Sequence, residues 1–148
     1  MNRIIFLFLV CAVGVGFCDE ADVISAKTRL IDNLADFERT NSQIQLKATK
    51  AGEIQYTLGR RVAGDRLVGI TRNSSSWTSP QNVQLSLNYP ANGGTGAVVT
   101  YVSIVVSQTS NQGRGYIRAG GIGQRFISII IDAYNTYNFS YSAEIYGV

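Results

Sequence analysis

Four residues in the C-terminal half of the sequence have side chains suited to binding a ligand. They are Arg114, Tyr116, Arg118 and Arg125. Arginines beside aromatic rings can hold single-stranded nucleic acid or anionic sugars by charge pairing and stacking. Arginine stems also cover apolar surface on solvated strand faces, and we favour that simpler interpretation. The four residues are therefore a speculative ligand surface rather than a defined site.

Catalytic residue types are scarce in this sequence. There is no histidine, and both cysteines, Cys11 and Cys18, lie within the first 18 residues. These absences exclude the usual Ser-His-Asp and Cys-His catalysis and the usual histidine or thiolate metal sites. The acidic residues after residue 53 are Asp65, Asp132 and Glu144, and their positions suggest no catalytic pair. We expect no enzyme activity, no catalytic residue, no cofactor and no bound metal.

The charge distribution is uneven. The full chain carries a net charge of +3, but residues 54–148 hold seven arginines, no lysine and three acidic residues. Arg60, Arg61 and Arg66 surround Asp65, which is expected to use part of that charge locally. The excess falls short of the dense basic patches of nucleic-acid-binding proteins. We expect an unidentified protein or glycan partner, and we do not expect contact with nucleic acid.

Two short motifs match the acceptor pattern for N-glycosylation. Asn73-Ser74-Ser75 lies in a polar stretch expected to be a turn, and Asn138-Phe139-Ser140 precedes an apolar position. Because side chains alternate along a strand, Asn138 is expected to point outward if Phe139 points inward.

The N-terminus has the pattern of a secretory signal peptide. Arg3 is followed by an unbroken apolar run, Ile4 to Val13, and small residues precede possible cuts after Gly16 or Cys18. A membrane anchor is the alternative, but only 15 residues separate Arg3 from Asp19, whereas a spanning helix needs about 20. We expect residues 1–18 to be removed and the mature chain to be secreted, extracellular and without a membrane span.

The segment that follows is expected to be helical. Apolar residues recur at steps of three or four between residues 20 and 40, with charged residues between them. A helix packed on the domain is favoured over a partner-binding or membrane-surface helix, and a processed pro-segment stays open. Residues 41–52 are expected to form a polar linker, so 19–53 is assigned as a helical extension and linker.

From residue 54 the apolar pattern changes to period two, which is typical of strands with one buried face. About seven strands are expected. They cover residues 54–58, 67–72, 83–89, 97–106, 116–119, 126–131 and 139–145. Glycine-rich and polar segments separate them, and no glycine cluster has the spacing of a phosphate loop. We predict a mainly β domain over residues 54–148, a single antiparallel β-sandwich, with a closed barrel as the alternative.

The order of short motifs in the β region resembles one known family. Gly64-Asp65-Arg66-Leu67-Val68, then Gly120-Gly-Ile-Gly123, then a terminal Glu144-Ile-Tyr-Gly147 are similar to the multiprotein bridging factor type 2 family of insects, also called probable salivary secreted peptides. The resemblance spans about residues 56–147 and implies a small secreted domain with no transferable catalytic or ligand residues.

Three functions follow as hypotheses. The first is a small secreted, non-enzymatic binding protein like the insect salivary peptides. The second is a transcriptional co-activator that bridges a DNA-bound regulator and the general transcription machinery, as the family's name implies. The third is a secreted lectin-like protein that binds an anionic or carbohydrate ligand through the arginine-rich surface.

Overall fold

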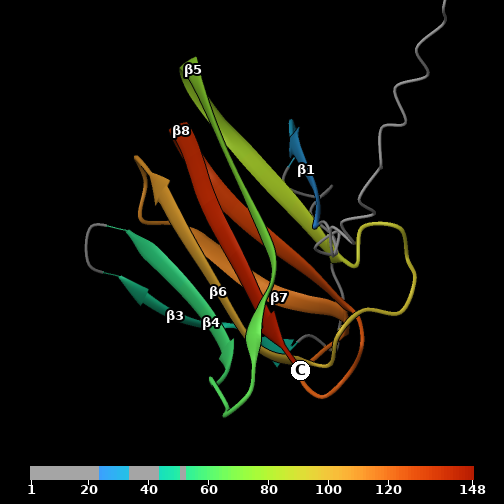
Figure 1. Cartoon of the computed structure of the whole chain (residues 1–148). Coiled ribbons are helices and arrows are strands. Elements are labelled where there is room, and N and C mark those ends of the chain that lie inside the picture. The colour runs from blue at the N-terminus through green and yellow to red at the C-terminus, as the bar shows by residue number, and fades with distance from the viewer. Residues whose placement is uncertain (1–23, 34–43, 51–52) are drawn as a thin grey trace, which may run out of the picture.

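The computed structural model describes residues 24–33, 44–50 and 53–148, and every regular element in them is a β-strand (Figure 1). The strands are β1 (Ser25–Leu30), β2 (Ile44–Gln45), β3 (Lys47–Lys50), β4 (Ile54–Gly59), β5 (Arg66–Tyr89), β6 (Val99–Gln108), β7 (Gly113–Gly120) and β8 (Ile127–Gly147). The predicted signal peptide lies outside the described residues.

The eight strands of the described residues all belong to one antiparallel sheet. Its main order is β1-β5-β8-β6-β4-β3, and β7 pairs with β8 and with β2. Among the described strands, only β3–β4 and β7–β8 are consecutive in sequence and also paired, so the other connections join strands that are not neighbours in the sheet. The mainly β, antiparallel part of the prediction is confirmed.

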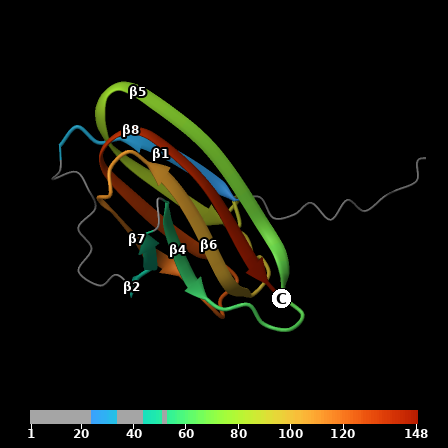
Figure 2. The same ribbon diagram turned by 90° about the vertical axis from the view of Figure 1, so that its left-hand side faces the viewer.

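Two long strands give the sheet its shape, because β5 and β8 each bend and take part in two layers (Figure 2). Residues 127–133 of β8 pair with β7 and with the second half of β5, whereas residues 138–147 pair with β6 and with the first half of β5. The register of β5 shifts between Ser76 and Val83, where the bend falls. The two separate sheets of a sandwich are therefore not seen in the described residues, because one continuous sheet forms both layers.

The N-terminal strands join one side of the two layers. β2 pairs with β7 in one layer, and β3 pairs with β4 in the other, with only Leu46 between the two strands. On the opposite side, β1 pairs only with residues 83–88 of β5. In the described part of the chain, residues 66–76 of β5 therefore have a paired strand on one side only.

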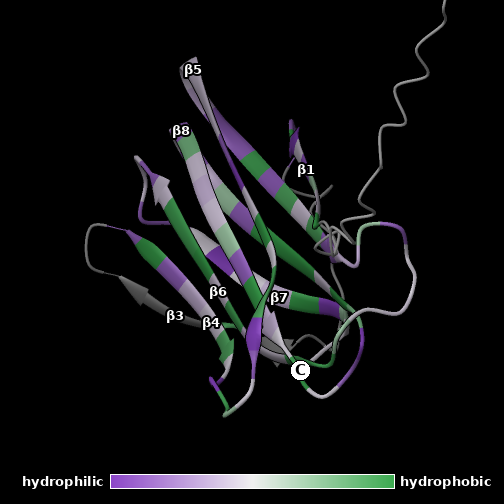
Figure 3. Ribbon diagram, in the orientation of Figure 1, coloured by the Kyte–Doolittle hydropathy of each residue, from purple (hydrophilic) through white to green (hydrophobic). Residues whose placement is uncertain are grey.

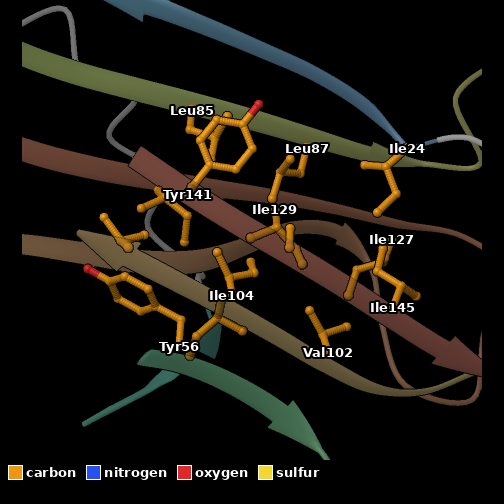
Figure 4. Close-up of a cluster of buried hydrophobic side chains, with 14 of the residues drawn as sticks. Ile24, Tyr56, Leu85, Leu87, Val102, Ile104, Ile127, Ile129, Tyr141 and Ile145 are labelled. Atoms are coloured by element: carbon orange, nitrogen blue, oxygen red, sulfur yellow. The ribbon is translucent and has the colours of Figure 1, made fainter. Parts of the chain in front are cut away.

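The core lies between the layers and follows the alternation of the strands (Figures 3 and 4). Tyr56, Leu85, Ile104 and Ile129 point into it from four different strands and are almost completely buried. Burying each such side chain contributes about 2 kcal/mol to stability. The segment around Ile130 is buried on both faces, as its continuous apolar sequence predicts.

The helix predicted within residues 20–40 is wrong where the structure describes it, because β1 occupies Ser25–Leu30. Ile24 and Ala26 pack on the core, while Lys27 and Arg29 point outward, so period two fits these residues as well as period 3.6. Pairing with β5 gives these residues both backbone hydrogen bonds and burial, and this favours the strand (period two) over the helix (period 3.6). The linker predicted for residues 41–52 is also wrong over 44–50, which form β2 and β3.

About seven strands were predicted for residues 54–148, whereas the described structure has five there, β4 to β8. The expected strands 67–72 and 83–89 are parts of β5, and 126–131 and 139–145 are parts of β8. The polar stretch expected to be a turn, residues 73–80, remains extended. Trp77 is the one apolar residue of this stretch that packs on the core, so the sequence lacks the alternation typical of a strand.

Candidate interaction site at the loop end

Several glycine-rich loops gather around the C-terminus of the chain, and we call this region the loop end (Figure 1). It consists of residues 59–66, 96–100, 120–126 and 146–148. Backbone hydrogen bonds join these segments directly. Arg60 N donates to Thr100 O at 3.2 Å, Gly123 N to Val99 O at 2.8 Å, and Val98 N to Val148 O at 2.8 Å. The motifs that are far apart in the sequence are thus neighbours in the fold.

Gly59 occupies the most restrictive backbone position of the loop end. Its φ is +71°, a value that favours glycine. A Cβ atom there would overlap the carbonyl oxygen of Thr100 and approach the Cδ1 atom of Ile122 to 2.7 Å. This close approach lets the β4–β5 loop pack directly against the β7–β8 turn.

Asp65 holds the β4–β5 loop in place through three hydrogen bonds and an ion pair. Its carboxylate accepts hydrogen bonds from Arg61 Nε at 2.8 Å, from Val62 N at 2.9 Å and from Thr100 Oγ1 at 3.0 Å, and Arg61 Nη2 lies 2.8 Å away. The hydrogen bond from Arg61 is the main cause that lowers the pKa of Asp65 to about 2. The carboxylate therefore stays ionised. The prediction that Asp65 uses part of the surrounding arginine charge is confirmed, and the structure shows that Arg61 provides it.

Arg61 also makes a cation–π contact. Its guanidinium carbon lies 3.8 Å from the centre of the Tyr146 ring, and that ring packs against Tyr101 at 5.9 Å between ring centres. Tyr146 Oη donates a hydrogen bond to Glu144 at 2.9 Å. The terminal Glu-Ile-Tyr-Gly motif is in this way linked to the Gly-Asp-Arg motif.

An apolar surface pocket of about 460 Å³ opens at the loop end. Its lining residues are Gly59, Arg60, Val62, Val98, Val99, Thr100, Ile122 and Gly123. Val62 and Ile122 are 40% and 41% exposed, and both line this one pocket. Arg60 lies at this pocket and makes no ion pair within the described residues. The pocket therefore combines apolar contact area with an available positive charge.

The speculative ligand surface on β7 has a different arrangement from that expected. Arg114 Nε donates to Asp132 Oδ2 at 2.8 Å, and Tyr116 is only 1% exposed, so its ring does not reach the surface. The Arg114 guanidinium lies 5.3 Å from the centre of the Tyr116 ring. The expected stacking of a ligand on Tyr116 is thus wrong, because the ring is buried and Arg114 already contacts both groups.

The other two arginines do not complete a common site. Arg118 is exposed on β7, and Arg125 lies in the β7–β8 turn, where its Nη1 donates to Gly96 O at 3.2 Å. Arg125 therefore belongs to the loop end, whereas Arg114 contacts a buried carboxylate in the sheet.

A polar row that the sequence does not predict crosses four neighbouring strands, β1, β5, β8 and β7. Arg29 Nε donates to Gln84 Oε1 at 2.9 Å, Gln84 Nε2 donates to Asp132 Oδ1 at 3.0 Å, and Arg114 completes the row. Gln84 and Asp132 are buried, and burial raises the pKa of Asp132 although both hydrogen bonds oppose that shift. The only sequence signal was a lone acid after the apolar run 126–131, and the strand order was needed to find its partners.

Both acceptor asparagines are exposed, but neither lies in a turn. Asn73 is in β5 opposite Tyr141, and Asn138 is in β8 opposite Ser76. Phe139 is buried, so the expected outward direction of Asn138 agrees with the structure. The expectation of a turn at Asn73 is wrong because β5 continues through it.

In the residues described, no group of three metal-ligating side chains comes together, and no helix has the length and hydropathy to cross a membrane. In the part of the chain that the structure describes, the ion pairs lie at the loop end and in the polar row.

The fold and the loop end define a mainly β domain in which loops pack closely around a small apolar pocket. The family model described as transcription activator MBF2 matches residues 58–147, and the chain belongs to this family. The match begins one residue before Gly59 and ends at Gly147, so it contains nearly all of the loop end. No curated protein and no solved structure matches the chain.

Proposed function

We propose that this chain is a non-enzymatic protein-binding domain that acts as a transcriptional co-activator, bridging a DNA-bound regulator and the general transcription machinery. The single observation that carries this proposal is the match of residues 58–147 to a family described as a transcription activator. A bridging protein needs a docking surface rather than a catalytic centre, and the loop-end pocket has the properties of one.

The chemistry of the pocket indicates the kind of partner segment that fits it. Val62 and Ile122 offer apolar contact, and Arg60 offers a charge without an ion-pair partner in the described residues. Complementary charge next to a buried anchor side chain favours correct docking. The proposed partner segment therefore carries an aliphatic or aromatic anchor with carboxylates beside it.

A transcription reporter tests this proposal. The untagged full chain is expressed with the reporter, and Ile122→Asp is expected to reduce activation at least fivefold because it places a charge in the pocket. Leu30→Asp is the matched control, since Leu30 is an exposed apolar residue on β1 outside the pocket. Equal loss in both variants, or no activation by the unaltered chain, would overturn the proposal.

A second candidate function is a secreted binding protein of the extracellular space. The observation in its favour is the N-terminal order of Arg3, the apolar run Ile4 to Val13 and the small residues before Cys18. Fractionation and N-terminal sequencing of the expressed chain separate the two candidates. Protein in the medium that begins after Gly16 or Cys18, with none in nuclei, supports secretion and contradicts the co-activator role.

A further inference from the structure

The first half of β5 is an open sheet edge with unusual composition. Residues 66–76 pair with β8 on one side, and no described strand pairs with them on the other. Residues 69–76 keep an uninterrupted register with β8, contain no proline and carry one charge, Arg72. Natural proteins usually protect such edges with charges, prolines or bulges, because an unpaired edge binds other strands. Here the register shifts lie only at the two ends of the stretch.

An exposed apolar side chain lies on this edge. Ile70 is 41% exposed and points to the outer face of the sheet. Its directly paired residue on β8, Glu144, points to the same face. Arg72 lies two residues further along the same face and makes no ion pair in the described residues. The outer face of this edge therefore carries Ile70 and Arg72 on β5, with Glu144 on the neighbouring strand β8.

We propose that two copies of this chain pair through the first halves of their β5 strands, antiparallel and centred on Thr71. An antiparallel edge is complementary to its own copy after a two-fold rotation, since each strand offers the same alternating donors and acceptors. This centre places Ile70 of one copy opposite Arg72 of the second copy, and the reverse, on the same face. The proposal is independent of the co-activator or secreted role.

The choice of a second copy rests on charge complementarity. In this register, Arg72 of the second copy covers Ile70 with its aliphatic stem. Its guanidinium then points toward Glu144, two strands away and about 10 Å between Cα atoms. The long side chains of arginine and glutamate bridge that distance. Each pair occurs twice because the interface is symmetric, and a register centred on Arg72 would instead bring two like charges together.

Cysteine cross-linking tests the register. The full chain is produced without glycosylation and with Cys11 and Cys18 replaced by serine. Thr71→Cys then places two thiols opposite each other at disulfide distance, and a covalent dimer is expected under mild oxidation. Asn73→Cys is the matched control, because Asn73 lies opposite Gly69 of the second copy. At least tenfold less dimer is expected from Asn73→Cys. Equal cross-linking of both variants, or none from Thr71→Cys, overturns the proposal.

A charge exchange tests the contacts without new thiols. Arg72→Glu and Glu144→Arg are each expected to weaken dimerisation in sedimentation equilibrium about tenfold, since each removes two ion pairs. The double variant is expected to restore the dimer, which a merely structural role would not do. Circular dichroism confirms folding of each variant. A monomeric unaltered chain at every concentration, or a double variant no better than the single ones, contradicts the proposal.

Discussion

At the residue scale, the most constrained charged group is Asp132. Its side chain is completely buried, and a buried carboxylate is tolerated only where hydrogen bonds and an opposite charge replace its water. Gln84 and Arg114 provide these, and Arg29 in turn donates to Gln84. Arg114 is therefore explained as the partner of a buried acid rather than as a surface group held ready for a ligand.

Replacing Arg114 with alanine is expected to destabilise the fold by about 3 kcal/mol, because it leaves a buried carboxylate without its ion pair. Arg118→Ala, on the same strand but exposed, is expected to change stability by about 0.5 kcal/mol at most. Urea unfolding of both variants measures the difference. Similar losses for the two would show that Asp132 does not depend on Arg114.

The Arg114→Ala variant is also expected to gain stability as the pH falls below neutral. Burial raises the pKa of Asp132, and removing the guanidinium removes an effect that lowers it. The folded variant then binds this proton at a higher pH than the unfolded chain does. Between these two pKa values the folded state holds more protons, so its stability rises as the pH decreases. A flat or opposite slope in urea unfolding against pH would rule out Asp132 as the cause.

At the scale of elements, the loop end depends on the contact between Gly59 and the β7–β8 turn. Gly59→Ala is expected to cost about 3 kcal/mol, since it combines a positive φ with overlap against the Thr100 backbone. Gly64→Ala is a matched control, because Gly64 also has a positive φ but nothing lies within 4 Å of an added Cβ. The control is expected to lose only about 1 kcal/mol.

Thermal unfolding and reporter activity of these two glycine variants give separate readouts. The pocket lies beside Gly59, so Gly59→Ala should reduce both, whereas Gly64→Ala should change mainly stability. Equal losses of stability in the two variants would contradict the close packing at Gly59.

How much of the fold the sequence predicts depends on the position of each strand. Strands such as 83–89 and 139–145 were found because each buries one complete face against the core. The sequence predicts a helix where β1 lies, because Leu30 is exposed although it is apolar, and Thr28 faces inward although it is polar. Residues 67–72 and 83–89 form one bent strand because both pair with β8. Local sequence patterns hold no information about this pairing.

Strand pairing, which local sequence does not contain, also decides how the loop end and the arginine surface of β7 are built. The Gly-Asp-Arg motif, Gly123 and Tyr146 could be recognised as important from their order, but their convergence at one pocket follows from strand connections. Tyr116 and Arg114 looked suitable for a ligand because sequence alone does not show which strand face is covered. Burial of Tyr116 and the position of Asp132 decide that question.

At the scale of the whole molecule, the two proposed interaction surfaces lie on different parts of the sheet. The pocket at the loop end requires the β4–β5 loop and the β7–β8 turn, whereas the edge of β5 requires an unobstructed row of backbone groups around Thr71. One of the two acceptor asparagines, Asn73, lies within that row. A modification of Asn73 would therefore affect pairing of the chain without altering the pocket.

A glycan on Asn73 is expected to keep the chain monomeric, because Asn73 would lie opposite Gly69 of the second copy, where a sugar cannot fit. The test expresses the chain in a glycosylating secretory host and measures mass by light scattering after mass spectrometry confirms occupancy of Asn73. Asn73→Gln from the same host is expected to dimerise, and Asn138→Gln is expected to remain monomeric, since Asn138 lies on β8 away from the edge. A dimer formed equally well by chains glycosylated at Asn73 would contradict pairing through β5. Since a glycan is added only along the secretory route, this pairing would be confined to chains that escape the modification.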